Sequence, residues 1–245
     1  MDFRTQLTAI KGVGEKTAAL FAKLHITDVG GLLEHYPRGY DLMEFPVSVS
    51  GVVPEKVCAI KAAVIGNLSV KRVRSLTITT VQAGDATGLF RITFFGMPYL
   101  KSVLRPGSIH VFRGICRVAG EKSRSAAAFK MEQPGIYKPE EYANLQGTLQ
   151  PRYALTAGLT NHMVAKAVRA ALEDMEKEGG LREFLPEEVR SQYRLISWAD
   201  ALRQIHCPND QEEAAGARRR LAFQEFLSFF LGLQRLKADN QVRKV

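Results

Sequence analysis

The chain has 245 residues, 46% of them hydrophobic, and a formal net charge of +9. This length allows two or three units of ordinary domain size, and the positive charge favours a polyanionic partner. Three cysteines far apart in sequence, at 58, 116 and 207, exclude a disulfide framework and a zinc site, and apolar runs well short of about 20 residues exclude a membrane-spanning helix, so we expect a cytoplasmic protein without a metal or a membrane partner.

Residues 1–45 are expected to form a helical N-terminal hairpin. Apolar residues recur at helical spacing from 5 to 36, with breaks at 12–14 and 25–28, and Pro37 ends the pattern. Residues 10–16 read Ile-Lys-Gly-Val-Gly-Glu-Lys and resemble the turn of a helix-hairpin-helix, in which backbone amides approach a phosphate. Gly12, Gly14 and Lys16 are therefore candidate phosphate contacts. A tight turn with solvated lysines explains the same residues, and the net charge of −1 of this segment favours that alternative.

Residues 46–145 are expected to form a five-stranded OB-fold β-barrel. From Val57 the apolar period changes to two, between turn-forming residues. This pattern predicts strands at 57–65, 75–81, 89–95, 109–118 and 127–132, with one or two helical turns at 98–104 between the third and the fourth. Three strands, a helical connection and two more strands is the order of the OB-fold, a closed barrel that often binds nucleic acid.

The net charge of the chain lies in this predicted barrel. Residues 46–140 contain 14 basic and 5 acidic residues, whereas the segments before and after have net charges of −1 and +1. Nearby charges act together within a Debye length of about 8–10 Å, so the barrel is predicted to bind nucleic acid. Solubilising surface charge is the alternative explanation.

Two aromatic residues stand where the third predicted strand leaves the barrel. Phe95 and Tyr99 are four residues apart, and the basic residues Lys101 and Arg105 follow. Aromatic side chains with basic neighbours suit the stacking of nucleobases, which is worth about 1–3 kcal/mol per base. An equally weighted alternative is that both rings fill or cap the end of the barrel core.

Further basic residues are candidate phosphate contacts. Lys71, Arg72 and Arg74 are expected in the loop between the first two strands, which contacts polynucleotides in many barrels of this type. Others lie along the predicted barrel, namely Arg91, Arg113, Arg117, Lys122 and Arg124.

Residues 146–245 are expected to be helical, with helices at 160–177, 186–193, 197–204 and about 210–238, and with Thr160 as the N-cap of the first. From Leu221 to Leu236 apolar residues cover nearly every direction around the last helix, which predicts a long apolar helix buried on several sides. We therefore expect a further domain to pack there. The chain has no phosphate-binding Gly-x-x-x-x-Gly-Lys-Ser/Thr loop and no recognisable acid–base set, so no catalytic residue and no cofactor are predicted for it.

Four segments resemble the N-terminal part of the RecG family, bacterial ATP-dependent DNA helicases that remodel branched DNA. They are Ile-Lys-Gly-Val-Gly at 10–14 through His-Tyr-Pro-Arg-Gly-Tyr at 35–40, Phe-Phe-Gly-Met-Pro-Tyr-Leu at 94–100, Tyr-Ala-Leu-Thr-Ala-Gly-Leu-Thr at 153–160, and Ala-Leu-Arg-Gln-Ile-His at 201–206 with Ala-Arg-Arg-Arg-Leu-Ala-Phe at 217–223. Each segment alone is weak evidence. Together, in this order and spacing, they span nearly the whole chain.

The resemblance implies an α+β protein with a wedge domain, whose aromatic residues, here Phe95 and Tyr99, stack on the parting base pairs of a replication fork or Holliday junction. The family usually has Asn after that Phe, whereas this chain has Gly96, and this departure puts the preset geometry of the loop in question. The resemblance assigns no DNA contact to the N-terminal glycine turn.

The resemblance also implies motor domains beyond Val245 that hydrolyse ATP with magnesium and pack on the helix at 221–236. The full-length enzyme would carry out branch migration and fork regression in recombination and repair, as a nucleoid-associated monomer, whereas the 245 residues alone would bind and split the junction without being an enzyme.

Two other functions fit the same residues. A stand-alone OB-fold that binds single strands predicts equal affinity for a junction and for a single strand of the same length, whereas a wedge prefers the junction. A structural adaptor whose barrel binds protein predicts little salt dependence of any DNA binding.

Overall fold

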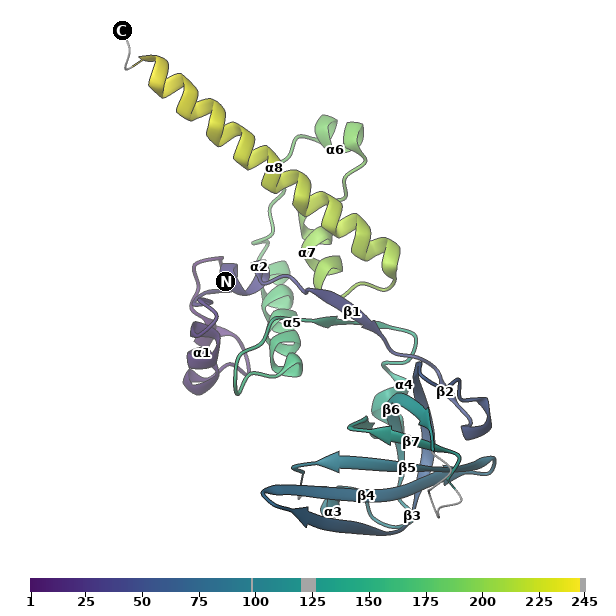
Figure 1. The fold of residues 1–245 in the computed structure, drawn as a ribbon. Helices are drawn as coiled ribbons and strands as arrows, with labels where there is room; N and C mark the ends of the chain where they lie inside the picture. Colours follow the sequence, from purple (N-terminus) through teal and green to yellow (C-terminus); the bar gives the residue numbers. More distant parts are fainter. Residues whose placement is uncertain (98, 120–126, 243–245) are drawn as a thin grey trace. The chain divides into compact units, whose positions relative to one another are not determined.

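The computed structural model describes residues 1–97, 99–119 and 127–242, with the backbone alone for 238–242 (Figure 1). The chain divides into two compact units, one made of Met1–Asp41 with Leu149–Val245 and the other of Leu42–Thr148. The helical segments before and after the sheet thus share one unit and one hydrophobic core. The limits placed at residues 45 and 145 as domain boundaries stay a prediction.

The N-terminal segment of the first unit contains less helix than its apolar pattern predicted. A single 3-10 turn, η1 (Leu7–Ala9), precedes α1 (Glu15–Ala22) and α2 (Val29–Glu34). The first helix of the expected helical hairpin is therefore corrected to this turn, because Gly12, at a φ of +92°, breaks the helical path soon after it begins. Asp28 starts α2, since its Oδ1 accepts the backbone N–H of Gly31 at 2.8 Å.

The C-terminal part of the first unit confirms the predicted helices. They are α5 (Asn161–Lys177), α6 (Glu187–Tyr193), α7 (Trp198–His206) and α8 (Gln211–Val242). Thr160 is the N-cap of α5 as predicted, with its hydroxyl accepting the N–H of Met163 at 3.2 Å. A short strand pair, β1 (Gly39–Leu42) with β9 (Leu149–Arg152), was not predicted, because four residues are too few for a clear alternation.

The core of the first unit forms around α5. Its apolar stripe is fully buried at Val164, Val168 and Ala171, as expected for residues spaced three and four apart on one face of a helix. Phe21 of α1 and Leu202 of α7 belong to the same cluster. Segments from both ends of the chain therefore stabilise one another.

The last helix is long but not apolar, which corrects the prediction of a buried apolar helix. Charged residues flank its apolar stretch Phe226–Leu233 on both sides, and only the first half is buried, through Ala217 and Leu221. Farther along, Phe226 and Phe230 are 73% and 63% exposed. None of the helices in the described ranges is long and apolar enough to cross a membrane.

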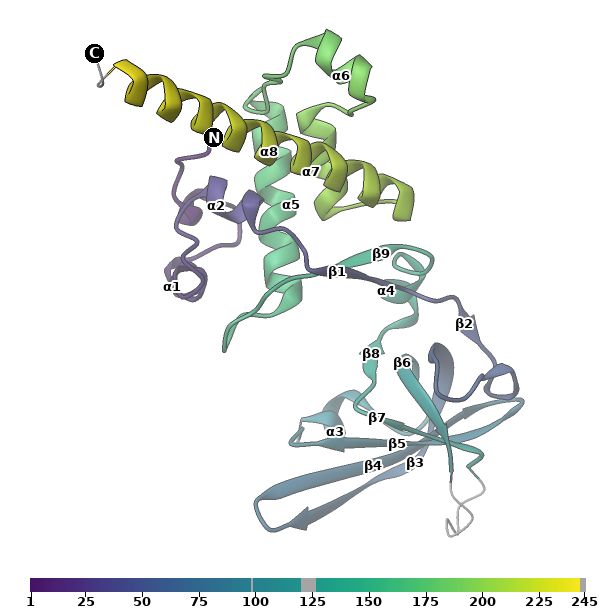
Figure 2. The same cartoon turned by 45° about the horizontal axis from the view of Figure 1, so that its top comes forward.

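The second unit is a mixed seven-stranded sheet in the order β2-β3-β4-β5-β7-β6-β8, drawn from a second angle in Figure 2. The strands are β2 (Pro46–Val47), β3 (Val57–Val73), β4 (Leu76–Asp85), β5 (Gly88–Phe95), β6 (Ile109–Val118), β7 (Phe129–Glu132) and β8 (Gly135–Tyr137). Short helical segments connect them, namely η2 (Val49–Gly51), α3 (Leu100–Val103) and α4 (Pro139–Ala143). The five predicted strands are present as β3 to β7, and β2 and β8 add to them.

The sheet closes at one end only, which corrects the predicted closed barrel. The first half of β3 pairs with β6, from Val57 opposite Ile115 to Ala63 opposite Ile109, and β5 pairs with β7 through residues 90–93. At the other end, residues 69–73 of β3 pair with β4 alone, and no described strand pairs with Phe94 or Phe95 on the side away from β4. The cause is the four-residue β7, which is too short to bridge β5 and β6 along their whole length.

The core of the second unit lies on the inner face of this sheet. Burial alternates along β5, where Phe90, Ile92 and Phe94 are fully buried and the residues between them are partly exposed. Leu100 and Leu104, at the two ends of α3, pack into the same cluster. The helix predicted at 98–104 therefore covers the inner face at the open end of the sheet and fixes where the chain after β5 runs.

Candidate nucleic-acid interface

Phe95 lies on the outer face of the sheet at its open end. Because successive side chains of a strand point to opposite faces, the burial of Phe94 in the core places Phe95 outside. Phe95 is opposite Ile78 of β4, and it is partly buried. Its carbonyl accepts a hydrogen bond from Nε2 of Gln133 at 3.4 Å, so the end of β5 is held without a neighbouring strand.

Tyr99 is displayed to solvent just beyond the strand. Its side chain is 61% exposed, and its carbonyl accepts hydrogen bonds from the backbone N–H and the hydroxyl of Ser102 at 3.1 and 2.7 Å. Gly96 makes the turn with a φ of +70° and donates its N–H to Thr77 O at 2.8 Å. Asparagine also tolerates this conformation, so glycine in place of the family's usual residue keeps the turn.

The three basic residues expected in a loop belong to a hairpin instead. Lys71 and Arg72 are strand residues, because β3 passes an irregularity between Ile65 and Ser69 and then pairs with β4 as far as Val73. Arg74 alone is in the connection, a turn of two residues, where its φ is +55°. This corrects the predicted loop. All three basic side chains are exposed.

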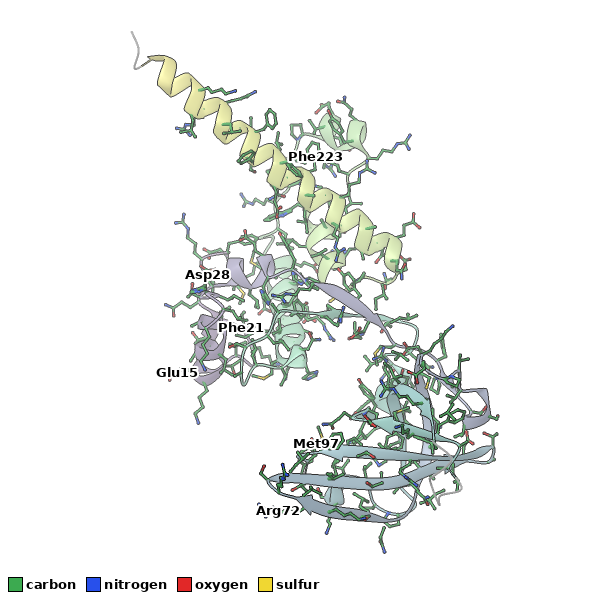
Figure 3. All side chains as sticks on the ribbon, in the orientation of Figure 1. Glu15, Phe21, Asp28, Arg72, Met97 and Phe223 are labelled. Carbon is green, nitrogen blue, oxygen red and sulfur yellow. The ribbon has the colours of Figure 1, made fainter. Side chains whose placement is uncertain are left out.

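The hairpin and the end of β5 lie at the same end of the sheet. Figure 3 labels Arg72 on the hairpin and Met97 just after β5, and both are found there. The register agrees, since Phe95 pairs with a residue only three positions after the two-residue turn. No acidic residue occurs between Glu55 and Asp85, so the potential around the hairpin is positive.

Lys101 and Arg105 complete the basic surroundings of Tyr99. Both side chains are exposed, Lys101 within α3 and Arg105 in the turn that follows it. Arg105 is held at its carbonyl, which accepts the backbone N–H and the hydroxyl of Ser108 at 2.9 and 2.6 Å. The turn is therefore ordered while the guanidinium group extends toward solvent.

The remaining basic candidates lie elsewhere on the sheet. Arg91 is on the same face as Phe95 but four residues away, or about 13 Å along the strand. Its register neighbour on β7 is Lys130, which the sequence analysis did not single out and which pairs in turn with Arg117. Arg91, Lys130 and Arg117 thus form one row across three neighbouring strands. The row depends on the order of the strands in the sheet, which the sequence pattern does not contain.

Two of these cations are engaged by carboxylates. Arg113 donates to Glu44 Oε2 at 2.8 Å and to the carbonyl of Leu42, and Arg117 lies 3.4 Å from Glu55. An arginine whose charge is already balanced by a neighbouring carboxylate attracts a phosphate group less strongly. Lys122 and Arg124 lie outside the described residues.

The glycine turn of the first unit is only partly as predicted. Gly12 has the positive φ of a required glycine, whereas Gly14, at a φ of −87°, caps α1 in a conformation open to any residue. Lys16 is exposed on α1, and Glu15 stands in the first turn, where its charge disfavours a phosphate. Whether these residues contact DNA stays a prediction.

Within residues 1–97, 99–119 and 127–242, no three His, Cys, Asp or Glu side chains are grouped so that they could hold a metal ion. The open end of the sheet brings together an aromatic and basic group of exposed or partly exposed side chains. Its chemistry suits stacking and charge neutralisation.

A family model described as the RecG wedge domain matches residues 6–175. The match includes the whole sheet, the open end with Phe95 and Tyr99, and the helices up to α5.

Relatives of the chain are considerably longer. A protein named ATP-dependent DNA helicase RecG from Streptococcus pneumoniae is 26% identical over 249 residues, which cover 99% of this chain and 34% of that protein. One of the same name from Bacillus subtilis is 27% identical, with 94% of this chain and 32% of that protein covered. The chain thus spans about a third of the length of these relatives.

A solved structure has the same fold. The structure described as RecG bound to a three-way DNA junction superposes with a TM-score of 0.74 at 22% sequence identity, and the alignment covers 98% of this chain and 32% of the other. At this sequence identity the similarity establishes the fold alone.

Proposed function

The chain belongs to the RecG wedge domain family, and from this membership we propose that it is the branched-DNA-binding region of an ATP-dependent DNA helicase. In this proposal the sheet binds a replication fork or a Holliday junction at its branch point. Its strand order, β3-β4-β5-β7-β6 with a return to β3, supports an OB-type wedge that is open at one end.

The exposure of Tyr99 among basic side chains carries the proposal. A tyrosine that only capped the core would bury its ring, yet this ring is 61% exposed while Leu100 beside it is buried. Phe95, on the outer face nearby, offers a second ring. We propose that the two rings stack on the last base pairs before the strands part.

The free energy needed to separate a base pair and the free energy gained by stacking on an aromatic side chain are of comparable size. Separating one stacked base pair costs about 1.4 kcal/mol on average, and stacking of a base on an aromatic side chain returns about 1–3 kcal/mol. Two rings at the branch therefore hold a fork open without the input of energy. Movement of the branch needs a motor.

We place that motor, with its ATP and magnesium, in the part of the protein that the longer relatives contain and these 245 residues do not. The sequence contains no phosphate-binding Gly-x-x-x-x-Gly-Lys-Ser/Thr loop, which supports this placement. The exposed aromatic stretch Phe226–Leu233 of α8 is the proposed packing site of the motor, since a large exposed apolar surface on a monomeric protein calls for a cover.

Branch migration and fork regression in recombination and repair are then the proposed activities of the whole enzyme. Its proposed setting is the bacterial nucleoid, and its proposed form is a monomer. For the 245-residue chain the proposal is narrower, namely binding and splitting of the junction.

Substrate preference tests the proposal. The 245-residue chain is titrated against a fluorescent three-way junction, a duplex and a single strand of equal length, at several salt concentrations. We expect the junction to bind most tightly, with a clear salt dependence. Equal affinity for junction and single strand would favour a stand-alone single-strand binder, and weak salt dependence would favour a protein-binding adaptor.

A further inference from the structure

The hairpin of β3 and β4 ends in two exposed apolar side chains. Val73 and Leu76 are directly opposite each other on either side of the two-residue turn, and they are 54% and 45% exposed. Among the described residues of this unit no further strand covers them, since this part of β3 pairs with β4 alone. Exposed apolar residues at a hairpin tip are an aggregation risk, so their presence calls for a partner.

This apolar tip lies on the same face of the sheet as Phe95. Along β3 the residues of one face alternate, so Val73 shares its face with Lys71, and Lys71 is opposite Ile78, which is opposite Phe95. The tip and the row of Phe95 are two residues apart along the strand, or about 7 Å. That spacing corresponds to about two base steps of 3.4 Å.

The charges around the tip select its partner. Lys71 is on the same face as the tip, Arg74 is in the turn beside it, Arg72 is on the opposite face of the same strand, and no acidic residue occurs from 56 to 84. A partner must therefore offer an apolar surface bordered by negative charge. Base pairs exposed at a branch, with phosphates on either side, have this combination, and other DNA-binding proteins insert leucine and similar side chains between base steps.

We propose that Val73 and Leu76 form a second wedge, which packs against the base pairs of the DNA arm next to the one contacted by Phe95 and Tyr99. This inference rests on the proposed function and adds a site to it. The turn supports such a role because only two residues connect the paired strands, so little conformational entropy is lost when the tip is immobilised. The basic residues beside it neutralise the phosphates of the same arm.

The experiment replaces both tip residues by threonine in the 245-residue chain. Val73→Thr with Leu76→Thr removes the apolar tip and places a β-branched threonine, which favours strands, at both positions, so the hairpin keeps its strand propensity. The three-way junction carries 2-aminopurine in the base pair next to the branch, and its fluorescence rises when that base unstacks. Val53→Thr with Ile109→Thr, at apolar positions of the same unit that are 54% and 53% exposed, is the matched control.

We expect the tip variant to bind the junction about five- to tenfold more weakly and to lose most of the 2-aminopurine signal, with no change in the salt dependence. Duplex affinity should stay within about twofold, as should junction binding by the control. A converse variant, Leu76→Phe, should raise the fluorescence. Unchanged junction affinity and fluorescence in the threonine variant, with native circular dichroism, would overturn the second wedge.

Failure of the two proposals gives different results. If the unmodified chain prefers the junction and the tip variant binds it with the same affinity and the same fluorescence, the proposed function stands and the second wedge is wrong. If the unmodified chain shows no preference for the junction, the proposed function itself fails.

Discussion

Tyr153 donates its hydroxyl hydrogen bond to Nδ1 of His206 across 3.0 Å, deep in the first unit. The assignment follows from the other ring nitrogen, Nε2, which lies 2.9 Å from the carbonyl of Leu33 and must donate to it because a carbonyl only accepts. His206 is fully buried and therefore neutral in this arrangement. Its two hydrogen bonds join three distant segments of the chain.

Acidification should destabilise the first unit through His206. Burial lowers the pKa of this imidazole from 6.5 to about 4, so between these pH values the unfolded chain binds a proton that the folded chain does not. The free energy of unfolding is therefore expected to fall as the pH drops from 6.5 to 4, by something of the order of 3 kcal/mol. Urea unfolding followed by the fluorescence of Trp198, the only tryptophan, measures it.

The control for this effect is His206→Gln, whose amide still donates to Leu33 and accepts from Tyr153. This variant should be less stable at pH 7 but should show a flatter dependence on pH above 4, where carboxylates contribute little. The same slope in the variant and in the unmodified chain would assign the pH dependence to other groups.

The cluster around His206 explains which part of the fold the sequence could predict. Tyr36, Tyr153 and His206 come from three of the segments that carry the family resemblance, and the ring of each tyrosine lies about 6 Å from that of His206. Tyr40, from the first of these segments, donates its hydroxyl to the carbonyl of Ile205 at 2.6 Å. The order of such residues along the chain identifies a family, but that they meet is visible only in the structure.

Removing Glu183 should cost more stability than removing its partner Arg220. The guanidinium of Arg220 is fully buried, 2.9 Å from Glu183 Oε1, and Glu183 also accepts the backbone N–H groups of Leu185 and Trp198. Burial raises the pKa of Glu183, but these backbone N–H groups and the charge of Arg220 outweigh it and hold the pKa below its usual value.

Glu183→Ala leaves a buried cation without its counter-ion, for which we expect a loss of about 3–5 kcal/mol. Arg220→Met leaves a carboxylate that keeps its backbone donors, so the loss should be clearly smaller. Urea unfolding of both variants at pH 7 gives the comparison. Equal losses would mean that the ion pair itself, rather than the stranded charge, sets the stability.

The hairpin shows the limit of sequence analysis at the site. Period-two alternation located the strands correctly, and β6 begins at Ile109 and ends at Val118 as predicted. It did not predict that β3 continues beyond residue 65 to Val73, because the strand is irregular after Ile65 and its pairing with β4 resumes only at Ser69. Strand ends depend on partners from elsewhere in the chain, which local residue patterns do not contain.

Neutralising the hairpin should weaken binding to every form of DNA. We expect Lys71→Ala, Arg72→Ala and Arg74→Asn together to reduce the slope of log K against log salt by up to about 2.7, or about 0.9 for each lost phosphate contact. Asparagine suits position 74, where the φ is +55°. Fluorescence anisotropy at four salt concentrations measures the slope. Lys138→Ala, which removes a lysine 3.7 Å from Glu141, is the control, and an unaltered slope in the triple variant would exclude the hairpin as a phosphate contact.

Replacing Phe95 and Tyr99 by alanine should weaken junction binding while the sheet stays folded. Tyr99 is mostly exposed and Phe95 lies outside the core, so the loss of stability should be about 1–2 kcal/mol at most. Each lost stack should cost about 1–3 kcal/mol of binding to the three-way junction. Because no charge is removed, the salt slope should stay unchanged, which distinguishes this variant from the neutralised hairpin.

Two controls separate stacking from general loss of aromatic surface. Tyr99→Phe keeps the ring and should keep the affinity, whereas Phe226→Ala with Phe230→Ala removes two exposed rings from α8 and should leave junction binding as it was. If the Phe95 and Tyr99 variant bound the junction as tightly as the unmodified chain, the rings would have no part in holding the branch open. The basic residues alone would then account for DNA binding, and binding by charge alone would not favour a branch over a duplex.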